Sequence, residues 1–170
     1  MSSFIIYIMG VAGSGKTTIG ILLSQETEIP FFDADEFHSS ANKEKMNTGQ
    51  PLTDADREEW LKALNQLARK QQKKGGAIIA CSALKEKYRK VLSEEITIPL
   101  VWIFLKGDFE LILERMKART GHFMPPAMLT SQFETLEVPG KAIIVDVAES
   151  PEKIVAELLS GINLKKKSSL

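Results

Sequence analysis

The stretch that decides the fold lies near the N-terminus and reads Gly10-Val11-Ala12-Gly13-Ser14-Gly15-Lys16-Thr17. Its spacing, G-x-x-x-x-G-K-T, lets the backbone curl until consecutive N–H groups point at one centre, where a following helix adds the positive end of its dipole. Such a loop holds a polyphosphate: the lysine reaches the outer phosphates and the threonine hydroxyl holds Mg²⁺. We therefore predict that a nucleoside triphosphate and Mg²⁺ bind at this P-loop through Gly10, Val11, Ala12, Gly13, Ser14, Gly15, Lys16, Thr17 and Thr18.

The flanking sequence has the order that such a loop requires. Phe4–Met9 is an apolar run suited to a buried parallel strand, and residues 18–23 can open a helix. A glycine turn without a ligand is the alternative interpretation, and this context disfavours it. We expect Lys16 to be catalytic, because we find no other cation placed to accompany the phosphate in the loop.

Apolar strand-like runs alternate with helical patterns along the chain, which favours an α/β fold with a parallel sheet. A helix is expected at 54–73, with Thr53 as its N-cap, and another near 151–161. We predict a three-layer P-loop NTPase fold, one domain over residues 1–164 with a frayed tail at 165–170. The five predicted parallel strands are Phe4–Met9, Ile29–Phe32, Ala77–Cys81, Leu100–Leu105 and Ala142–Val147.

Composition sets the broad class of protein. The chain has 170 residues, of which 44% are hydrophobic, enough for one core. Because 22 basic residues balance 22 acidic ones, we expect no general attraction to nucleic acid or to a membrane. The single cysteine, Cys81, is expected in the core and cannot form an internal disulfide, which fits a reducing compartment and a cytoplasmic location.

Two carboxylates follow the second predicted strand. Asp33 and Asp35 stand where a parallel sheet binds its ligands, at the carboxyl ends of the strands. We expect Asp33 to serve the magnesium site, and Asp35 to orient or deprotonate an attacking hydroxyl. The alternative is a pair of aspartates that cap a helix.

Two polar segments do not look like plain sheet connections. Residues 36–53 begin a predicted substrate-binding helical segment at about 36–75, and residues 115–126, rich in Gly, Pro and Arg, are a candidate lid. Arg115 and Arg119 share a helix face in the lid, so they could neutralise charge on the transferring phosphoryl group. A solvated arginine pair is the alternative.

Further candidate binding residues surround the same sheet edge. Lys85 and Arg89 follow the third strand at a spacing of four residues, which fits an anionic substrate, although an ordinary basic helix face is the alternative. His38 follows Asp35 closely and is a candidate polar contact to substrate, whereas His122 is a candidate for pinning the lid. Each histidine could instead be structural.

Several blocks beyond the P-loop resemble those of gluconate kinases. They are Asp33-Ala-Asp35-Glu-Phe-His38, the segments 42–46 and 49–61, Cys81–Arg89, Leu105-Lys106-Gly107, Gly121–Met124 and Ser131–Glu137. The resemblance implies phosphorylation of D-gluconate by ATP on the 6-hydroxyl. It also implies a fold like that of nucleoside monophosphate kinases, with a mobile lid, and a homodimer. The aspartate pair also resembles that of shikimate kinase.

Gluconate carries a carboxylate and several hydroxyls, so its pocket needs a cation and polar groups. The candidates for these contacts are Asp35, His38, Lys45, Arg57, Lys85, Arg89 and Gln132. Another small-molecule kinase and a nucleotide-binding switch are the competing hypotheses. A switch GTPase would want an Asn-Lys-x-Asp segment, and Asn42-Lys43-Glu44-Lys45 lacks the aspartate.

Overall fold

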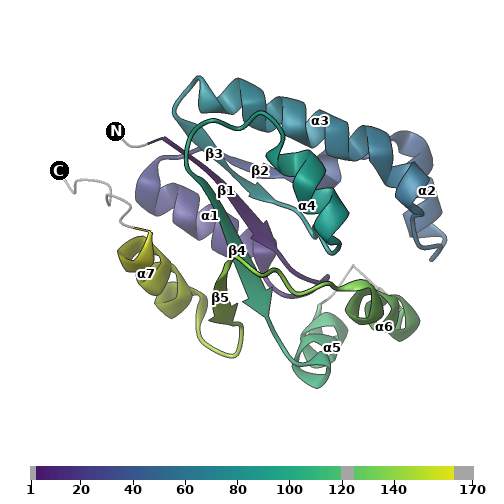
Figure 1. Cartoon of the computed structure of the whole chain (residues 1–170). Helices are drawn as coiled ribbons and strands as arrows, with labels where there is room; N and C mark the ends of the chain where they lie inside the picture. The colour runs from purple at the N-terminus through teal and green to yellow at the C-terminus, as the bar shows by residue number, and fades with distance from the viewer. Residues whose placement is uncertain (1–2, 120–124, 163–170) are drawn as a thin grey trace.

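Five parallel strands form one sheet in the order β2-β3-β1-β4-β5 (Figure 1). The computed structural model describes residues 3–119 and 125–162 of the chain. The α/β fold and all five predicted strands are confirmed, with ends that differ from the predicted ones by no more than two residues. The strands are β1 Phe4–Met9, β2 Phe31–Asp33, β3 Gly76–Ala80, β4 Leu100–Lys106 and β5 Ile143–Asp146.

Helices connect the strands and cover both faces of the sheet (Figure 1). The first cover includes α1 Lys16–Thr27 and α7 Pro151–Gly161, and the second includes α3 Asp54–Gln72 and α4 Glu86–Ser93. The remaining elements are the 3₁₀ turn η1 Ala34–Phe37 and the helices α2 Ser40–Asn47, α5 Phe109–Ala118 and α6 Pro126–Thr135.

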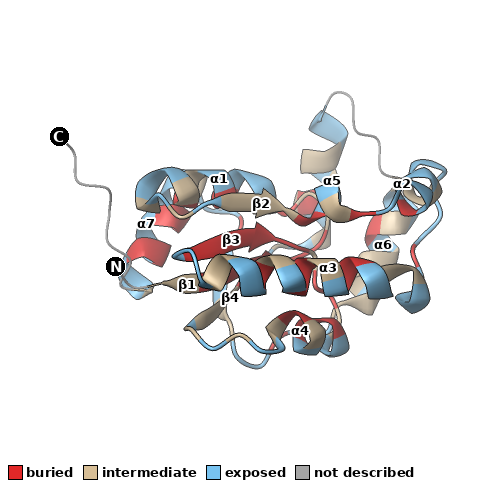
Figure 2. Cartoon of the chain, turned by 90° about the horizontal axis from the view of Figure 1, so that it is seen from above, coloured by how far each residue is buried: buried red, intermediate tan, exposed pale blue. Residues whose placement is uncertain are grey.

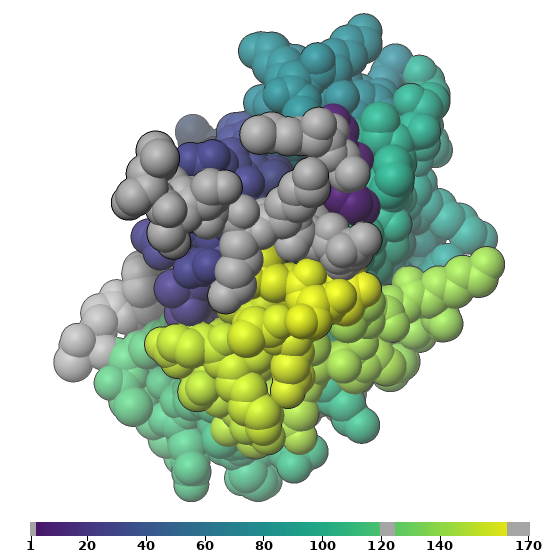
Figure 3. Space-filling view, turned by 90° about the vertical axis from the view of Figure 1, so that its left-hand side faces the viewer, coloured from purple at the N-terminus to yellow at the C-terminus, as the bar shows by residue number. Residues whose placement is uncertain are grey.

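The alternation of side chains along the buried strands divides the core into two halves. On one face, Tyr7 of β1 packs with Leu64 of α3 and Leu92 of α4. On the other face, Ile8 packs with Leu23 of α1 and Leu158 of α7, and these two helices lie side by side (Figure 3). Figure 2 shows the result, with burial concentrated on the central strands and on the inner sides of the helices. The three layers are therefore helix, sheet and helix.

A smaller third cluster lies at the carboxyl edge of the sheet. Here Val11 of the P-loop is buried with Leu84, Ile112 of α5 and Leu129 of α6. The cluster places α5 and α6 against the phosphate-binding loop, so the helices that flank the candidate lid are packed against the site. Within the described parts of the chain, no helix is both long and apolar enough to cross a membrane.

The end of α3 and the start of β3 depend on glycine. Thr53 caps the N-terminus of α3 in a capping box with Asp56, as the sequence predicts for Thr53, and the helix ends before Gly75 and Gly76. Both glycines have positive φ, +108° and +109°. A Cβ on Gly76 would lie 2.1 Å from the backbone oxygen of Phe4, whereas a Cβ on Gly75 would meet nothing within 4 Å.

We predict that Gly76→Ala lowers the free energy of unfolding by roughly 2 kcal/mol more than Gly75→Ala, measured by urea denaturation. The two positions share the same unfavourable φ for alanine, so the difference between the variants reports the clash with β1. Equal destabilisation by the two substitutions would contradict this prediction. It would mean that β1 can move away from a Cβ at position 76 without a loss of stability.

Candidate active site

The P-loop joins β1 to α1 at the carboxyl edge of the central strand. Gly13 and Gly15 have φ values of +76° and +98°, a conformation that side chains disfavour. Gly15 also forms the N-terminal boundary of α1 and supplies no side-chain cap, so the first N–H groups of the helix face the space above the loop. A Cβ on Gly15 would meet nothing within 4 Å. This open, uncapped cradle fits a polyphosphate.

Lys16 folds back over the loop that it follows. Its Nζ donates hydrogen bonds to the backbone oxygens of Gly10 and Val11, at 3.1 and 3.0 Å. Loss of solvation lowers the pKa of Lys16, and the carboxylates of Asp35 and Asp33 act in the opposite direction. The Lys16 side chain therefore lies over the loop, with the carboxylates of Asp33 and Asp35 close enough to affect its pKa.

Thr17 and Asp33 meet although they belong to different elements. The Thr17 hydroxyl donates to Oδ2 of Asp33 at 2.9 Å, while Oδ1 of Asp33 accepts the backbone N–H of Asp35 at 3.0 Å. A hydroxyl and a carboxylate are hard oxygen donors, and Mg²⁺ takes few protein ligands when it also binds phosphate oxygens. The pair therefore fits the predicted magnesium site. Among the described residues, no group of three or more His, Cys, Asp or Glu side chains forms a separate metal site.

Asp35 lies in the first turn of η1, near the charges of Asp33 and Lys16. Loss of solvation raises the pKa of Asp35, and the neighbouring Asp33 carboxylate raises it further, while Lys16 lowers it. The carboxyl group is therefore a stronger base than an ordinary aspartate. Of the two aspartates, Asp33 caps η1, as the capping alternative proposed, and Asp35 does not.

His38 lies at the C-terminal end of η1, three residues after Asp35, and is only 8% exposed. Its ring stacks on Trp60, with centroids 4.2 Å apart, and Trp60 donates from Nε1 to the backbone oxygen of Ala34 at 2.7 Å. Burial, followed by the charges of Arg57 and Lys43, lowers the pKa of His38 to about 4. The imidazole is neutral at pH 7, and its Nδ1 is buried without a partner among the described residues.

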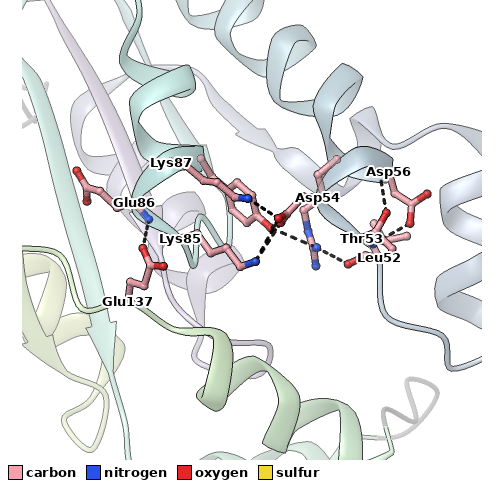
Figure 4. Close-up of polar contacts among 10 residues, drawn as sticks. Leu52, Thr53, Asp54, Asp56, Lys85, Glu86, Lys87 and Glu137 are labelled. Carbon is pink, nitrogen blue, oxygen red and sulfur yellow. Dashed lines mark hydrogen bonds and ion pairs between the residues drawn. The ribbon is translucent and has the colours of Figure 1, made fainter.

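The predicted basic residues divide by their partners. Lys45 forms an ion pair with Asp56 at 2.6 Å. Arg57 donates to the backbone oxygen of Leu52 and lies 5.6 Å from the centre of the Tyr88 ring. Lys85 forms an ion pair with Asp54 at 3.1 Å (Figure 4). Both lysines thus pair with the first turn of α3, but only Lys85 joins Arg57 at the Tyr88 ring.

Arg89 points into the protein and is only 5% exposed. Its guanidinium donates to the backbone oxygens of Ala83 at 2.8 Å, Leu84 at 3.3 Å and Glu137 at 2.9 Å. It also contacts the Glu86 carboxylate through Nε and Nη2. The spacing of Lys85 and Arg89 predicted a shared basic face, but the structure separates them: Lys85 turns to Asp54, and Arg89 braces the loop after β3.

Gln132 contacts the P-loop, whereas the two lid arginines have other neighbours. Oε1 of Gln132, on α6, accepts the backbone N–H of Ala12 at 2.7 Å. Arg115 donates to the backbone oxygen of Val147 at 2.6 Å. Arg119 ends α5, and its charge is among those that lower the pKa of Lys16. The rest of the predicted lid includes residues 120–124, with His122, which lie outside the described residues.

The structure also brings in residues that sequence reasoning did not assign to the site. Asp54 and Lys87 join the cluster around Tyr88, and Glu137 joins the Arg89 brace, where its carboxylate accepts the N–H of Glu86 at 2.6 Å. These contacts span 31 to 51 residues in sequence, so local spacing carried no signal for them. The resemblance blocks include all of these residues, but the resemblance assigned them no role.

Fold and site together are those of a P-loop kinase. The shikimate kinase family model matches residues 12–163. The thermoresistant gluconokinase of Escherichia coli strain K12 is 42% identical over 160 residues, which cover 91% of each chain. The gluconokinase of Gluconobacter oxydans is 42% identical over 156 residues, covering 89% of this chain and 87% of the relative. The chain belongs to the gluconokinase family.

Solved structures agree with this assignment. A gluconokinase from Sinorhizobium meliloti 1021 superposes with a TM-score of 0.87 at 40% identity, covering 95% of this chain and 92% of that one. The shikimate kinase of Aquifex aeolicus superposes with a TM-score of 0.61 at 23% identity, which shows a shared fold.

We predict that Arg89→Met lowers the free energy of unfolding by about 2–4 kcal/mol, because it removes the donor from buried backbone oxygens. Chemical denaturation measures the change. The matched control is Lys90→Met, at the exposed neighbouring position, which we expect to change stability by less than about 0.5 kcal/mol. Unchanged stability in Arg89→Met would contradict the bracing role and return this residue to the substrate pocket.

Proposed function

We propose that this chain is a gluconokinase, which transfers the terminal phosphoryl group of ATP to the 6-hydroxyl of D-gluconate. The observation that carries the proposal is the contact between Thr17 and Asp33, which sets Asp35 beside Lys16 at the phosphate-binding loop. The gluconokinase relatives, which match over most of the chain, support the choice of substrate. A coupled assay with ATP and a panel of gluconate, shikimate and glucose tests it.

Each group at the sheet edge has a task in this reaction. The P-loop N–H groups and Lys16 bind the phosphates of ATP, and Thr17 and Asp33 hold Mg²⁺. Bound Mg²⁺ supplies positive charge that offsets the charge on the phosphate oxygens. Asp35 orients the 6-hydroxyl of gluconate and accepts its proton. Arg115 and Arg119 offset charge on the phosphoryl group during transfer.

Gluconate binds with its hydroxyl end toward Asp35 and its carboxylate toward the cations beyond His38. Arg57 and Lys85 lie at the Tyr88 ring, and Arg57 is close enough to His38 to lower its pKa. Because His38 is neutral, it suits a hydroxyl rather than a carboxylate. Lys45, Arg89 and Gln132 contribute by holding neighbouring segments, as their partners within the chain suggest.

Three further proposals rest on the resemblance and on composition. The segment at about 115–126 closes as a lid when both substrates are bound, which would exclude water from the reaction. The active protein is a homodimer in the cytoplasm. Size-exclusion chromatography with light scattering tests the oligomeric state, and hydrogen exchange in the lid with and without ligands tests closure.

We predict that Lys16→Ala reduces kcat by about 10²–10³-fold, because it removes a preorganised charge contact to the transferred phosphoryl group. The coupled ATP–gluconate assay measures this change, with circular dichroism as the check on folding. Lys153→Ala, which removes an exposed lysine that pairs with Glu149, serves as the control and should keep parental turnover. A folded Lys16→Ala variant with at least half of the parental kcat would contradict the P-loop assignment.

We predict that Asp35→Asn keeps the fold and the affinity for ATP but lowers kcat, because the amide cannot accept the proton. Asp35 acts as a base only when ionised, so parental kcat should rise with pH through its raised pKa, above the ordinary aspartate value of 3.8. The Asn variant should lack this rise. An Asn variant that keeps both the parental kcat and the parental pH profile, alongside an inactive Asp33→Asn, would move the role of base to Asp33.

A further inference from the structure

Three cations surround the ring of Tyr88 at the start of α4. Arg57 lies 5.6 Å from the ring centre, Lys85 lies 5.7 Å away and Lys87 lies 5.9 Å away. The acidic group that contacts two of them is Asp54, in the first turn of α3. These four side chains therefore carry more positive than negative charge, so the cluster attracts an anion.

Both carboxylate oxygens of Asp54 accept hydrogen bonds from side chains of this cluster. Its two oxygens accept hydrogen bonds from Lys85, at 3.1 and 3.4 Å, from Lys87 and from the Tyr88 hydroxyl (Figure 4). The hydrogen bond from Lys87, then those from Tyr88 and Lys85, lower the pKa of Asp54, so it is a carboxylate at neutral pH. Burial raises the pKa of Tyr88 to about 12, so its hydroxyl stays a donor.

The cluster lies where the far end of the substrate would reach. Lys85 follows β3, and β3 stands between β2, which leads to Asp35, and β1, which leads to the P-loop. The Arg57 charge is close enough to His38 to lower its pKa, and Nδ1 of His38 is buried and unpartnered within the described residues. The proposed orientation of gluconate runs along these groups, from Asp35 past His38 and Arg57 to Lys85.

We infer that Asp54 is an internal competitor for the substrate carboxylate: it occupies the Lys85–Lys87–Tyr88 cluster in the free enzyme, and gluconate displaces it. The inference rests on the proposed function and adds a residue to its specificity. The exchange replaces one carboxylate by another on the same donors, so Lys85 and Lys87 keep a carboxylate partner. It also selects against neutral sugars, which cannot replace the ion pairs that they break.

The Asp54 side chain is exposed enough to leave the cluster without moving the backbone. Asp54 is 43% exposed on its side chain and Lys87 is 59% exposed, so Asp54 can turn into water when the substrate arrives. Exposed ion pairs of this kind are weak, and a weak internal contact is one that a ligand can displace. The capping box of α3 uses Thr53 and Asp56, so α3 keeps its N-terminal cap without Asp54.

The test compares Asp54→Asn with the parent at low ionic strength. Calorimetric titration gives the Kd for gluconate without ATP, and the coupled assay gives its KM. We expect Asp54→Asn to bind gluconate about 3- to 10-fold more tightly, with a matching fall in KM. The control is Glu58→Gln, which removes an equal charge one turn further along α3, where Glu58 pairs with Lys62, and should change neither value.

Two further measurements identify the cause of a gain in gluconate affinity. The neutral polyol glucitol should bind no better to Asp54→Asn than to the parent, because it has no carboxylate to accept the freed donors. Adding Lys85→Met to Asp54→Asn should remove the gain for gluconate. Unchanged or weaker gluconate binding in Asp54→Asn overturns the inference, as does an equal gain for glucitol or a gain that survives Lys85→Met. A parent that neither binds nor phosphorylates gluconate overturns the proposed function instead.

Discussion

The pairing of β1 on both of its edges is the constraint on which the site depends. This strand pairs with β3 on one side and with β4 on the other, and its residues 5–9 are fully buried. The P-loop therefore begins at the end of a strand, β1, that cannot shift without breaking both halves of the core. Because β2 lies beyond β3 in the same parallel sheet, Asp33 reaches Thr17 at a sheet edge whose geometry is already set.

A second, polar framework joins the segments that the sheet alone would leave independent. Buried Arg89 ties the loop after β3 to residue 137, and Gln132 ties α6 to the P-loop. The segment from α6 to Glu137 thus contacts both the phosphate-binding loop and the start of α4, directly after the loop that follows β3. The helix α6 directly follows the candidate lid. A movement of the lid would therefore displace these hydrogen bonds, and with them the P-loop and the loop after β3.

The sequence allowed prediction of those parts of the site that depend on local spacing. The P-loop, the aspartates after β2 and the Thr53 cap follow from patterns a few residues long, and the strands follow from apolar runs. The partners of the basic side chains did not follow, because they lie far away in sequence. Nothing in the spacing of Lys85 and Arg89 shows that one turns outward to Asp54 while the other is buried among backbone oxygens.

Charge states divide the residues proposed to contact gluconate into two halves with different chemistry. His38, stacked on Trp60 and beside Arg57, is neutral at pH 7, so it can exchange hydrogen bonds with a hydroxyl but offers no charge. Arg57 and Lys85 lie beyond it as cations around a phenol. A ligand with hydroxyls along its length and a carboxylate at one end matches both halves only in one direction, which leaves its hydroxyl end toward Asp35 and the P-loop.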